Sequence, residues 1–488
     1  MSFHVAPRSL RARYGAMPLP VRSALWFTFA GITLKAIAML TTPIFTRIMT
    51  TDQYGLYSLY NSWFQVLMVI TTFRLTAAVF NKGMSIFPEA RDEYTATMQT
   101  TSTALVVVAM VVYAVFHGRF DAITGLPSVV MIAMFSELLF SPSVAFWTAR
   151  ERYDYHYRPV VIVTVGISAL TAIAGVVAVV MSGDKAVARI LAGAVVSTGI
   201  GIAIYVRNIR RAGRLFVPAY ARYALMFNLP LVPHYLSMYA LDQLDRIMVA
   251  RMVSLSAAAI YSVGYTVGLA IRVATDSASA ALIPWQYRQL EADNLRGLGR
   301  RLSQVFVLYA FFVLFFVALA PELVAVLGGS AYQGAIYVVP PVSVATFFIF
   351  AYMMFGNIEV YYDATKMMTY GSVVAAVANV ALNAVYIPRF GYVAAGYTTL
   401  ACYGGLAAAH YVYVTRVVRV RVDGGRIVDA KVMLGLTAGL LAGMALLVAT
   451  YQTPGVRYVL IVLGCVGLYL QRTRIRALLG SINEPRAQ

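Results

Sequence analysis

Long apolar stretches alternate with short connections along the whole chain, and the connections are alternately rich and poor in Lys and Arg. We divide the chain into about fourteen apolar spans, all but the short last one long enough to cross a bilayer as a helix. With the amino terminus placed in the cytoplasm, 28 of the 39 basic residues fall in cytoplasmic segments, 7 at the outside and 4 well inside spans. Cytoplasmic loops of membrane proteins carry such an excess of Lys and Arg. The pattern predicts an all-α polytopic membrane protein with both termini in the cytoplasm.

Composition agrees with this class and excludes others. The chain is 60% hydrophobic and 12% charged, which is more apolar than a soluble domain of this size requires. Its net charge of +19 is spread over alternate connections and forms no single stripe, so it favours membrane lipids over nucleic acid as the partner. The outside connections are too short to form the platform that a membrane glycan polymerase or ligase would need.

The predicted spans are 23–46, 55–80, 96–116, 126–148, 159–181, 187–206, 224–250, 257–281, 302–327, 333–357, 369–388, 393–414, 431–451 and 456–471. A weak repeat relates the first span junction to the seventh. Arg47-Ile-Met is followed ten residues later by Tyr57-Ser58, and Arg251-Met-Val is followed ten residues later by Tyr261-Ser262, 204 positions further on. Transporters are commonly built from such repeats.

The repeat predicts two pseudo-symmetric six-helix lobes. The N-terminal lobe covers residues 1–206, and a basic cytoplasmic linker covers 207–222. The C-terminal lobe covers 223–418, and residues 419–488 add two more spans and a cytoplasmic tail.

Proline and tyrosine mark two further features. Pro230 and Pro233 interrupt span 7, and because proline removes a backbone donor, we expect a bend that lines a cavity or serves packing alone. Tyr54, Tyr57 and Tyr60 lie near a predicted interface and are typical of an aromatic belt, with sugar stacking as the alternative.

Ionisable residues inside spans are costly, so they indicate function unless they are paired. In the first lobe Lys35, Arg74 and Glu137 lie within spans, which leaves an excess of one positive charge. Neither cation has an acidic neighbour within a helical turn. We therefore predict that Lys35 and Arg74 bind an anion that visits the membrane interior, while Glu137 could carry a proton or sodium.

The second lobe holds Asp242, Asp245, Arg246, Arg272 and Asp276 within spans 7 and 8. Asp242 and Arg246 are four residues apart, as are Arg272 and Asp276, and side chains at this spacing share a helix face. These residues are predicted to form structural ion pairs between the two spans or to couple an ion. Arg272 is in addition a weaker candidate for binding the substrate.

Three kinds of motif are missing from the sequence: a phosphate loop, a metal-ligand cluster and the spacing of a catalytic triad. We therefore expect neither an enzyme nor a bound cofactor or metal.

Three stretches of the chain resemble a known family. They are Thr42-Pro43-Ile44-Phe45-Thr46-Arg47-Ile48-Met49 with Tyr54-Gly55-Leu56-Tyr57-Ser58; Leu229-Pro230 to Pro233-His234 with Asp245-Arg246 and Ile260-Tyr261-Ser262; and Asn379 to Asn383 with Ile387-Pro388-Arg389-Phe390-Gly391-Tyr392 and Ala394-Ala395-Gly396. In this order and spacing they resemble the Wzx-type polysaccharide flippases of the multidrug/oligosaccharidyl-lipid/polysaccharide exporter superfamily.

The resemblance implies two six-helix bundles around a central cavity. It implies that an undecaprenyl-diphosphate-linked glycan is moved from the inner to the outer leaflet of the bacterial plasma membrane, for surface polysaccharides such as lipopolysaccharide or exopolysaccharide. The polysaccharide polymerase and chain-length machinery are candidate partners. Two alternatives from the same superfamily are a cation-coupled multidrug exporter and a peptidoglycan-precursor flippase.

Overall fold

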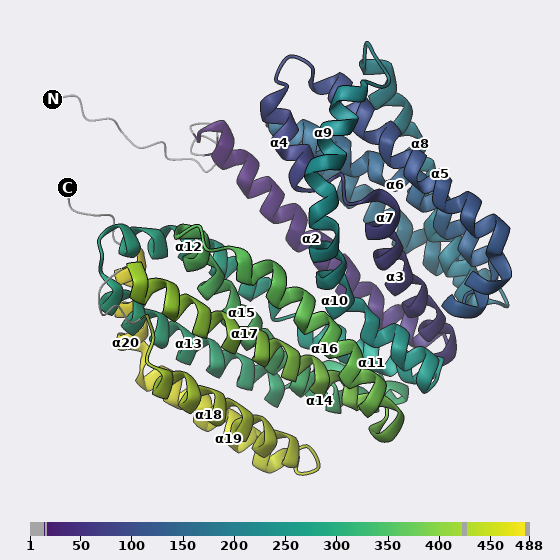
Figure 1. Ribbon diagram of the computed structural model, residues 1–488. Helices are drawn as coiled ribbons and strands as arrows, with labels where there is room; N and C mark the ends of the chain where they lie inside the picture. Colours follow the sequence, from purple (N-terminus) through teal and green to yellow (C-terminus); the bar gives the residue numbers. More distant parts are fainter. Residues whose placement is uncertain (1–13, 15–16, 422–426, 484–488) are drawn as a thin grey trace. The chain divides into compact units, whose positions relative to one another are not determined.

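The computed structural model describes Tyr14 and residues 17–421 and 427–483, and all regular structure within these residues is helical (Figure 1). The helices are α2 (Leu19–Ile48), α3 (Thr51–Thr72), α4 (Ala78–Ile86), α5 (Arg91–Thr124), α6 (Ser128–Tyr153), α7 (Tyr157–Met181), α8 (Lys185–Arg211), α9 (Pro218–Asn228), η1 (Leu229–Leu231), α10 (Val232–Met252), α11 (Leu255–Leu269), α12 (Arg272–Glu291), α13 (Leu295–Ala318), α14 (Ala320–Leu327), η2 (Ser330–Tyr337), α15 (Val339–Tyr361), α16 (Lys366–Phe390), α17 (Val393–Arg421), α18 (Ala430–Ala449), α19 (Pro454–Leu470) and α20 (Arg472–Asn483).

Fourteen helical segments coincide with the fourteen predicted spans. Ten helices in the described part of the chain are long and apolar enough to cross a membrane, and α11 with α12 counts as one of them. The other four predicted spans correspond to α3 with α4, α9 with α10, α17 and α19. The prediction of an all-α polytopic membrane protein is therefore confirmed.

The chain divides into two compact units, unit 1 up to Leu236 and unit 2 from Ser237. The division falls inside α10, and α9, which the sequence divided between the basic linker and the second lobe, packs in unit 1 against α4 and α5. The lobe boundaries that we predicted differ from this division by the residues that α9 and the start of α10 contribute. The last part of the predicted tail, residues 484–488, lies outside the described residues.

Unit 1 is built around α6 and α8, which pack along one another, while α7 packs on α8 and α2 packs on α7. Half of the most apolar stretch of α6 is buried, against 6% of that of α2. Gly201 of α8 allows the close approach, because a Cβ there would lie 2.8 Å from the backbone carbonyl oxygen of Phe140 in α6. The inner helices can therefore carry polar side chains away from lipid.

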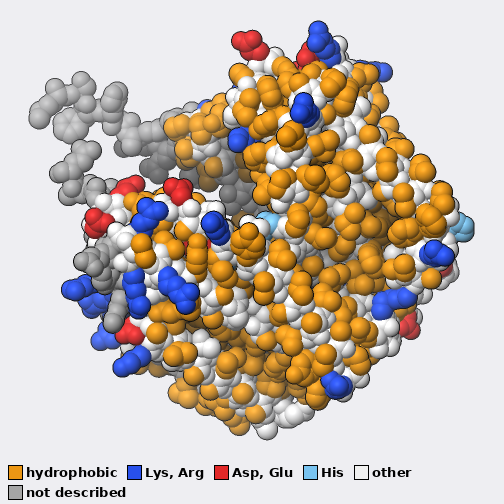
Figure 2. Space-filling view, viewed as in Figure 1, with side chains coloured by type: hydrophobic (Ala, Val, Ile, Leu, Met, Phe, Trp, Pro, Cys, Tyr) orange, Lys and Arg blue, Asp and Glu red, His pale blue; other side chains and the backbone are white. Residues whose placement is uncertain are grey.

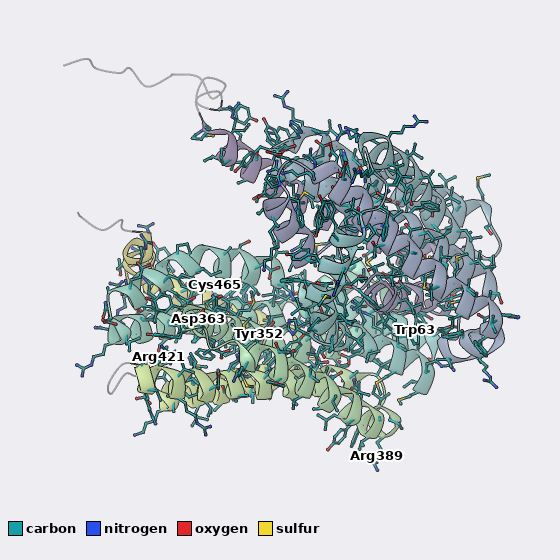
Figure 3. The ribbon with its side chains drawn as sticks, turned by 45° about the horizontal axis from the view of Figure 1, so that its top comes forward. Trp63, Tyr352, Asp363, Arg389, Arg421 and Cys465 are labelled. Carbon is teal, nitrogen blue, oxygen red and sulfur yellow. The ribbon has the colours of Figure 1, made fainter. Side chains whose placement is uncertain are left out.

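Unit 2 is built around α15. In its most apolar stretch 89% of residues are buried, because α11, α12, α13, α17 and α18 surround it. A helix that is apolar all round belongs inside a bundle. In Figure 3, Asp363, in the turn after α15, and Arg421, at the end of α17, lie toward one end of the unit, and Arg389, at the end of α16, lies toward the other. Neighbouring helices thus run in opposite directions, as consecutive membrane spans must.

The outer surfaces of both units are apolar. Large side chains such as Leu40, Val180, Met181 and Leu434 are exposed, and hydrophobic side chains cover most of the visible face of each unit in Figure 2. Such a surface is stable in contact with lipid tails but not in water.

The repeat predicted from the sequence has the same local structure in both copies. α2 ends at Ile48 and α10 at Met252, and the caps of the following helices are Thr50 and Ser254, each pair 204 residues apart. Thr50 and Ser254 each accept a hydrogen bond from a backbone N–H three residues later. Because such a cap satisfies one of the free amides at a helix start, it fixes the position of the turn in each copy.

Candidate functional site

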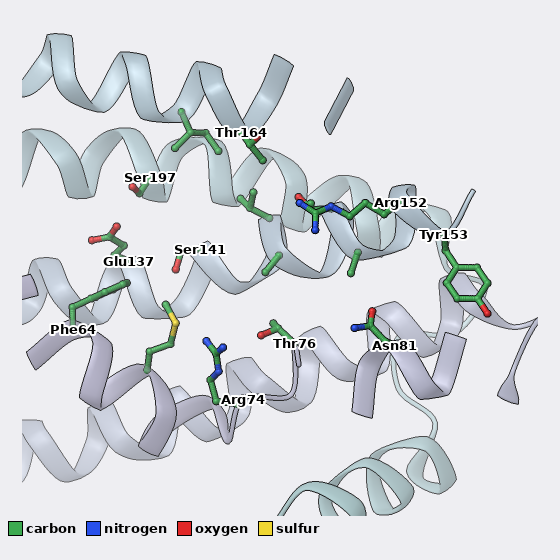
Figure 4. A pocket seen from close by; sticks show the side chains of 16 residues that line it. Phe64, Arg74, Thr76, Asn81, Glu137, Ser141, Arg152, Tyr153, Thr164 and Ser197 are labelled. Atoms are coloured by element: carbon green, nitrogen blue, oxygen red, sulfur yellow. The ribbon is translucent and has the colours of Figure 1, made fainter. Parts of the chain in front are cut away.

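A cavity of about 730 Å³ lies within unit 1, a volume typical of small-molecule binding sites (Figure 4). Its walls come from α3 and the break after it, and from α4, α6, α7 and α8. The lining residues are Phe64, Met68, Arg74, Thr76, Asn81, Glu137, Ser141, Val144, Ala145, Thr148, Ala149, Arg152, Tyr153, Thr164, Ile167 and Ser197. The lining mixes hydroxyl, amide and charged groups with apolar side chains. The cavity therefore suits a ligand that has both polar groups and apolar surface.

Arg74 enters this cavity from a break in a membrane span. α3 ends at Thr72, and Phe73 and Arg74 have φ values of 48° and 52°, a left-handed backbone that non-glycine residues rarely adopt. The Asn228 side chain donates a hydrogen bond to the Phe73 carbonyl oxygen, and the Thr72 hydroxyl accepts one from the Arg74 amide at 3.3 Å. Non-helical backbone at membrane depth is tolerated only where protein covers it or a cavity receives it. Here the Asn228 side chain satisfies the Phe73 carbonyl at the break, and the Arg74 guanidinium lines the cavity.

Glu137 of α6 supplies the carboxylate of the cavity. The Tyr60 hydroxyl donates a hydrogen bond of 2.7 Å to its Oε2 atom, and Ser197 lines the same cavity. Among the described residues no cationic side chain forms an ion pair with Glu137. Tyr60, expected in an aromatic belt, is only 4% exposed and is in fact a cavity-side donor.

Charges of opposite sign occupy different parts of the cavity. In Figure 4, Glu137 and Ser197 lie toward one end, Arg152 and Asn81 toward the other, and Arg74 between them. Arg152 follows Glu137 by fifteen residues on α6, which at 1.5 Å per residue is about 22 Å along the helix. Its guanidinium lies 4.9 Å from the centroid of the Phe27 ring. The cavity can thus hold an elongated ligand with an anionic group at one end.

The sequence placed Arg152 outside the spans, because the apolar stretch ends at residue 148 while α6 continues to Tyr153. Arg152 was therefore counted only among the basic residues of a cytoplasmic connection. Lys35, in contrast, was predicted to bind the substrate, but its side chain is exposed on α2 and is absent from the lining of the cavity. Of the first-lobe residues predicted from burial and charge, the structure brings together Arg74 and Glu137.

Arg272 lies beside an interrupted helix, as Arg74 does. α11 ends at Leu269 and α12 begins at Arg272, whereas Arg74 lies between the end of α3 at Thr72 and the start of α4 at Ala78. Each unit thus has an arginine at the interruption of the helix that follows the repeated turn. One guanidinium nitrogen of Arg272 lies 3.6 Å from the Asp242 carboxylate on α10, and about a quarter of each side chain remains exposed. The ion pair expected between spans 7 and 8 therefore forms between Asp242 and Arg272.

The two pairs expected along single helices are not the ones that form. Arg246 donates instead to the backbone carbonyl of Asp242 at 2.8 Å and to Gln243 at 2.9 Å, and it lies over the Tyr265 ring at 4.3 Å. Asp276 is exposed, and no ion pair to it occurs within the described part of the chain. Spacing along one helix could not reveal that Arg272 on α12 would pair with the Asp242 carboxylate on α10.

Asp245 is the most deeply buried acid of this group, with no exposed surface. Its Oδ2 atom accepts hydrogen bonds from Tyr261 at 2.7 Å and from Thr399 at 2.5 Å, and its Oδ1 atom accepts one from Asn383 at 2.6 Å. Asn379 donates in turn to Thr399 at 3.4 Å. This network joins α10, α11, α16 and α17, which no sequence spacing predicted.

The fold and the cavity define a polytopic membrane protein of the transporter type. Residues 21–288, more than half of the chain, match the model of a family described as polysaccharide biosynthesis protein, and the protein belongs to that family. The chain is 29% identical over 164 residues to "Lsg locus putative protein 1" of Haemophilus influenzae. The match covers 33% of this chain and only 40% of that relative.

Solved structures share the fold. The inward closed conformation of the lipid II flippase MurJ superposes with a TM-score of 0.65 at 11% identity, covering 92% of this chain and all of that one. The inward-facing conformation of a multidrug resistance MATE family transporter gives 0.60 at 13% identity, covering 80% and 96%. A transporter of the same superfamily from Pyrococcus furiosus gives 0.54 at 10% identity, covering 85% and 100%. The family match confirms the predicted family, and the solved structures confirm the fold.

Proposed function

We propose that this protein is a flippase that carries a polyprenyl-diphosphate-linked oligosaccharide from the inner to the outer leaflet of the bacterial inner membrane, for surface polysaccharide synthesis. The cavity of unit 1 supports this proposal most directly. It offers Arg74 and Arg152 to an anionic group and hydroxyl and amide side chains to a sugar. An arginine suits a diphosphate because its planar donors match the phosphate oxygens.

The proposed mechanism is alternating access. The cavity receives the head group from the cytoplasmic side, Arg74 holds the diphosphate, and the lipid tail stays in the bilayer. The loaded protein then exposes the head group to the outside. Two negative charges that move outward across an inside-negative membrane gain about 4–5 kcal/mol per 100 mV, which biases the direction of transport. Asp242, Asp245, Arg246 and Asp276 remain candidates for ion coupling or structural pairing.

The test uses protein reconstituted in liposomes and a short-chain prenyl diphosphate that carries N-acetylglucosamine, with its transfer between leaflets followed by enzymatic access to the sugar. We expect Arg74→Gln to slow the transfer at least tenfold, which corresponds to about 1.4 kcal/mol, and Arg74→Lys to lie in between. Arg119→Gln removes the same charge at an exposed position on α5 and is the matched control. Normal transfer by Arg74→Gln would exclude Arg74 as the anion anchor.

Two earlier expectations are tested separately, one in the same assay and one by mass spectrometry. Lys35→Gln should reduce transfer if Lys35 contacts the cargo in some state of the transport cycle, and should leave it unchanged otherwise. Native mass spectrometry of the protein from its own host identifies the cargo: a bound polyprenyl-diphosphate glycan supports the proposal, and a pentapeptide-bearing disaccharide would make it a peptidoglycan-precursor flippase.

A cation-coupled exporter of drugs is the second candidate, because the same cavity contains the Glu137 carboxylate without an ion pair in the described residues. This alternative predicts that lipophilic cations bind and that Glu137→Gln abolishes their binding. A cavity that carries a prenyl diphosphate predicts instead that Arg74→Gln has the larger effect on binding.

A further inference from the structure

Two carboxylates on α6, Glu151 and Glu137, have different partners. Glu151, near the end of α6, accepts hydrogen bonds from the Trp147 indole at 3.0 Å and from Arg211 at 2.8 Å, and His156 lies 2.8 Å from it. Its charge is therefore compensated by the protein. Glu137 lies in the cavity, where the Tyr60 hydroxyl donates to it, and no ion pair to it occurs among the described residues.

This difference leaves Glu137 able to accept more hydrogen bonds. A carboxylate has about four acceptor positions, and the Tyr60 hydroxyl occupies one of them. A ligand in the cavity can supply the remaining donors through hydroxyl, amide or ammonium groups. A carboxylate on the ligand would instead place two like charges together in a partly buried site, which is unfavourable.

The arrangement of the cavity places the sugar part of the cargo at Glu137. Arg152 lies toward the other end and Arg74 lies between the two (Figure 4), so the positive charge that would attract an anionic diphosphate lies from the middle of the cavity to the end opposite Glu137. Ser141, Ser197 and the Phe64 ring lie near Glu137 in the lining of the cavity (Figure 4). This end of the cavity therefore combines a carboxylate and hydroxyls with an aromatic ring, which suits the hydroxyl and amino groups and the apolar face of a sugar.

We propose that Glu137 determines cargo specificity: it accepts hydrogen bonds from a neutral or amino sugar and excludes a sugar that carries a carboxylate at that position. This inference rests on the proposed function. The inference specifies which class of glycan the flippase carries, because a repeat unit that places a uronic acid at Glu137 would be rejected.

The test compares three probes, each a short-chain prenyl diphosphate linked to a disaccharide. The second sugar is N-acetylglucosamine, glucosamine or glucuronic acid, and binding to the purified full-length protein is measured by titration calorimetry. The wild type should bind the glucuronic acid probe at least about tenfold more weakly than the other two, a difference of about 1.4 kcal/mol. Glu137→Gln keeps the size and one acceptor oxygen of the side chain. It should abolish the discrimination against the glucuronic acid probe and the preference for the glucosamine probe.

Tyr60→Phe removes one hydroxyl that contacts Glu137 without changing the charge, so it should preserve the order of the three affinities. If Glu137→Gln and the wild type rank the probes identically, the specificity role is refuted. The order of affinities is independent of the anchor: Arg74→Gln should weaken all three probes by a common factor. A change in ranking with Glu137→Gln but no loss with Arg74→Gln would leave the specificity role intact and overturn the anion anchor. Failure of the wild type to bind any probe would overturn both.

Discussion

Replacement of Asp245 by Ala tests whether the buried network stabilises unit 2. The substitution leaves three donors, on Tyr261, Thr399 and Asn383, without their acceptor in a fully buried site. Hydrogen bonds between helices of membrane proteins are worth about 0.6 kcal/mol on average and about 1.7 kcal/mol at most. Three of them give an expected loss of about 2–5 kcal/mol in the free energy of unfolding.

A native cysteine can report the unfolding of unit 2. Cys402 is buried on α17, and Cys465 is exposed on α19. In a Cys465→Ser background, a thiol-reactive fluorescent dye labels Cys402 only when unit 2 opens. A denaturant titration of the labelled fraction in detergent gives the change in unfolding free energy between Asp245→Ala and the parent.

Asp276→Ala is the matched control, because it removes the same kind of side chain from an exposed position in the same unit. It should change the unfolding free energy by less than about 0.5 kcal/mol. An Asp245→Ala variant as stable as Asp276→Ala would refute the reasoning that these hydrogen bonds hold α10, α11, α16 and α17 together.

Two further predictions concern packing. The Arg189 guanidinium lies 3.5 Å from the centroid of the Phe45 ring and 3.4 Å from that of the Tyr57 ring. Arg189→Ala should therefore lower the free energy of unfolding of unit 1 by about 2 kcal/mol, measured by thermal melts. Arg189→Met keeps the apolar stem of the side chain and should recover part of the loss. A Cβ at Gly264 would lie 2.8 Å from a backbone carbonyl oxygen in η2, so Gly264→Ala should cost about 1–3 kcal/mol, whereas Gly166→Ala, which points into open space, should cost less than a quarter of that.

The sequence alone determined the class of protein and the positions of its helices. Whether a segment enters the bilayer depends on the transfer free energy of its own residues, so apolar stretches and basic connections can be read locally. The repeated turn was visible for the same reason, because caps such as Thr50 and Ser254 act on amides three residues away. Arg74 and Glu137 were also recognisable, since an ionisable side chain inside a span is costly wherever its helix packs.

Only the tertiary structure decided the partners of these residues. Asp242 had Arg246 on its own helix, yet its carboxylate pairs with Arg272 on the next one. Lys35 had the charge of a binding residue but lies on an exposed face of α2, while Arg152, assigned to a cytoplasmic connection, reaches the cavity. The energy of a charge depends on atoms within a few ångströms, and in a helical bundle those atoms come from segments distant in the sequence. Spacing along one helix therefore identifies which residues need partners, and packing determines which partners they find.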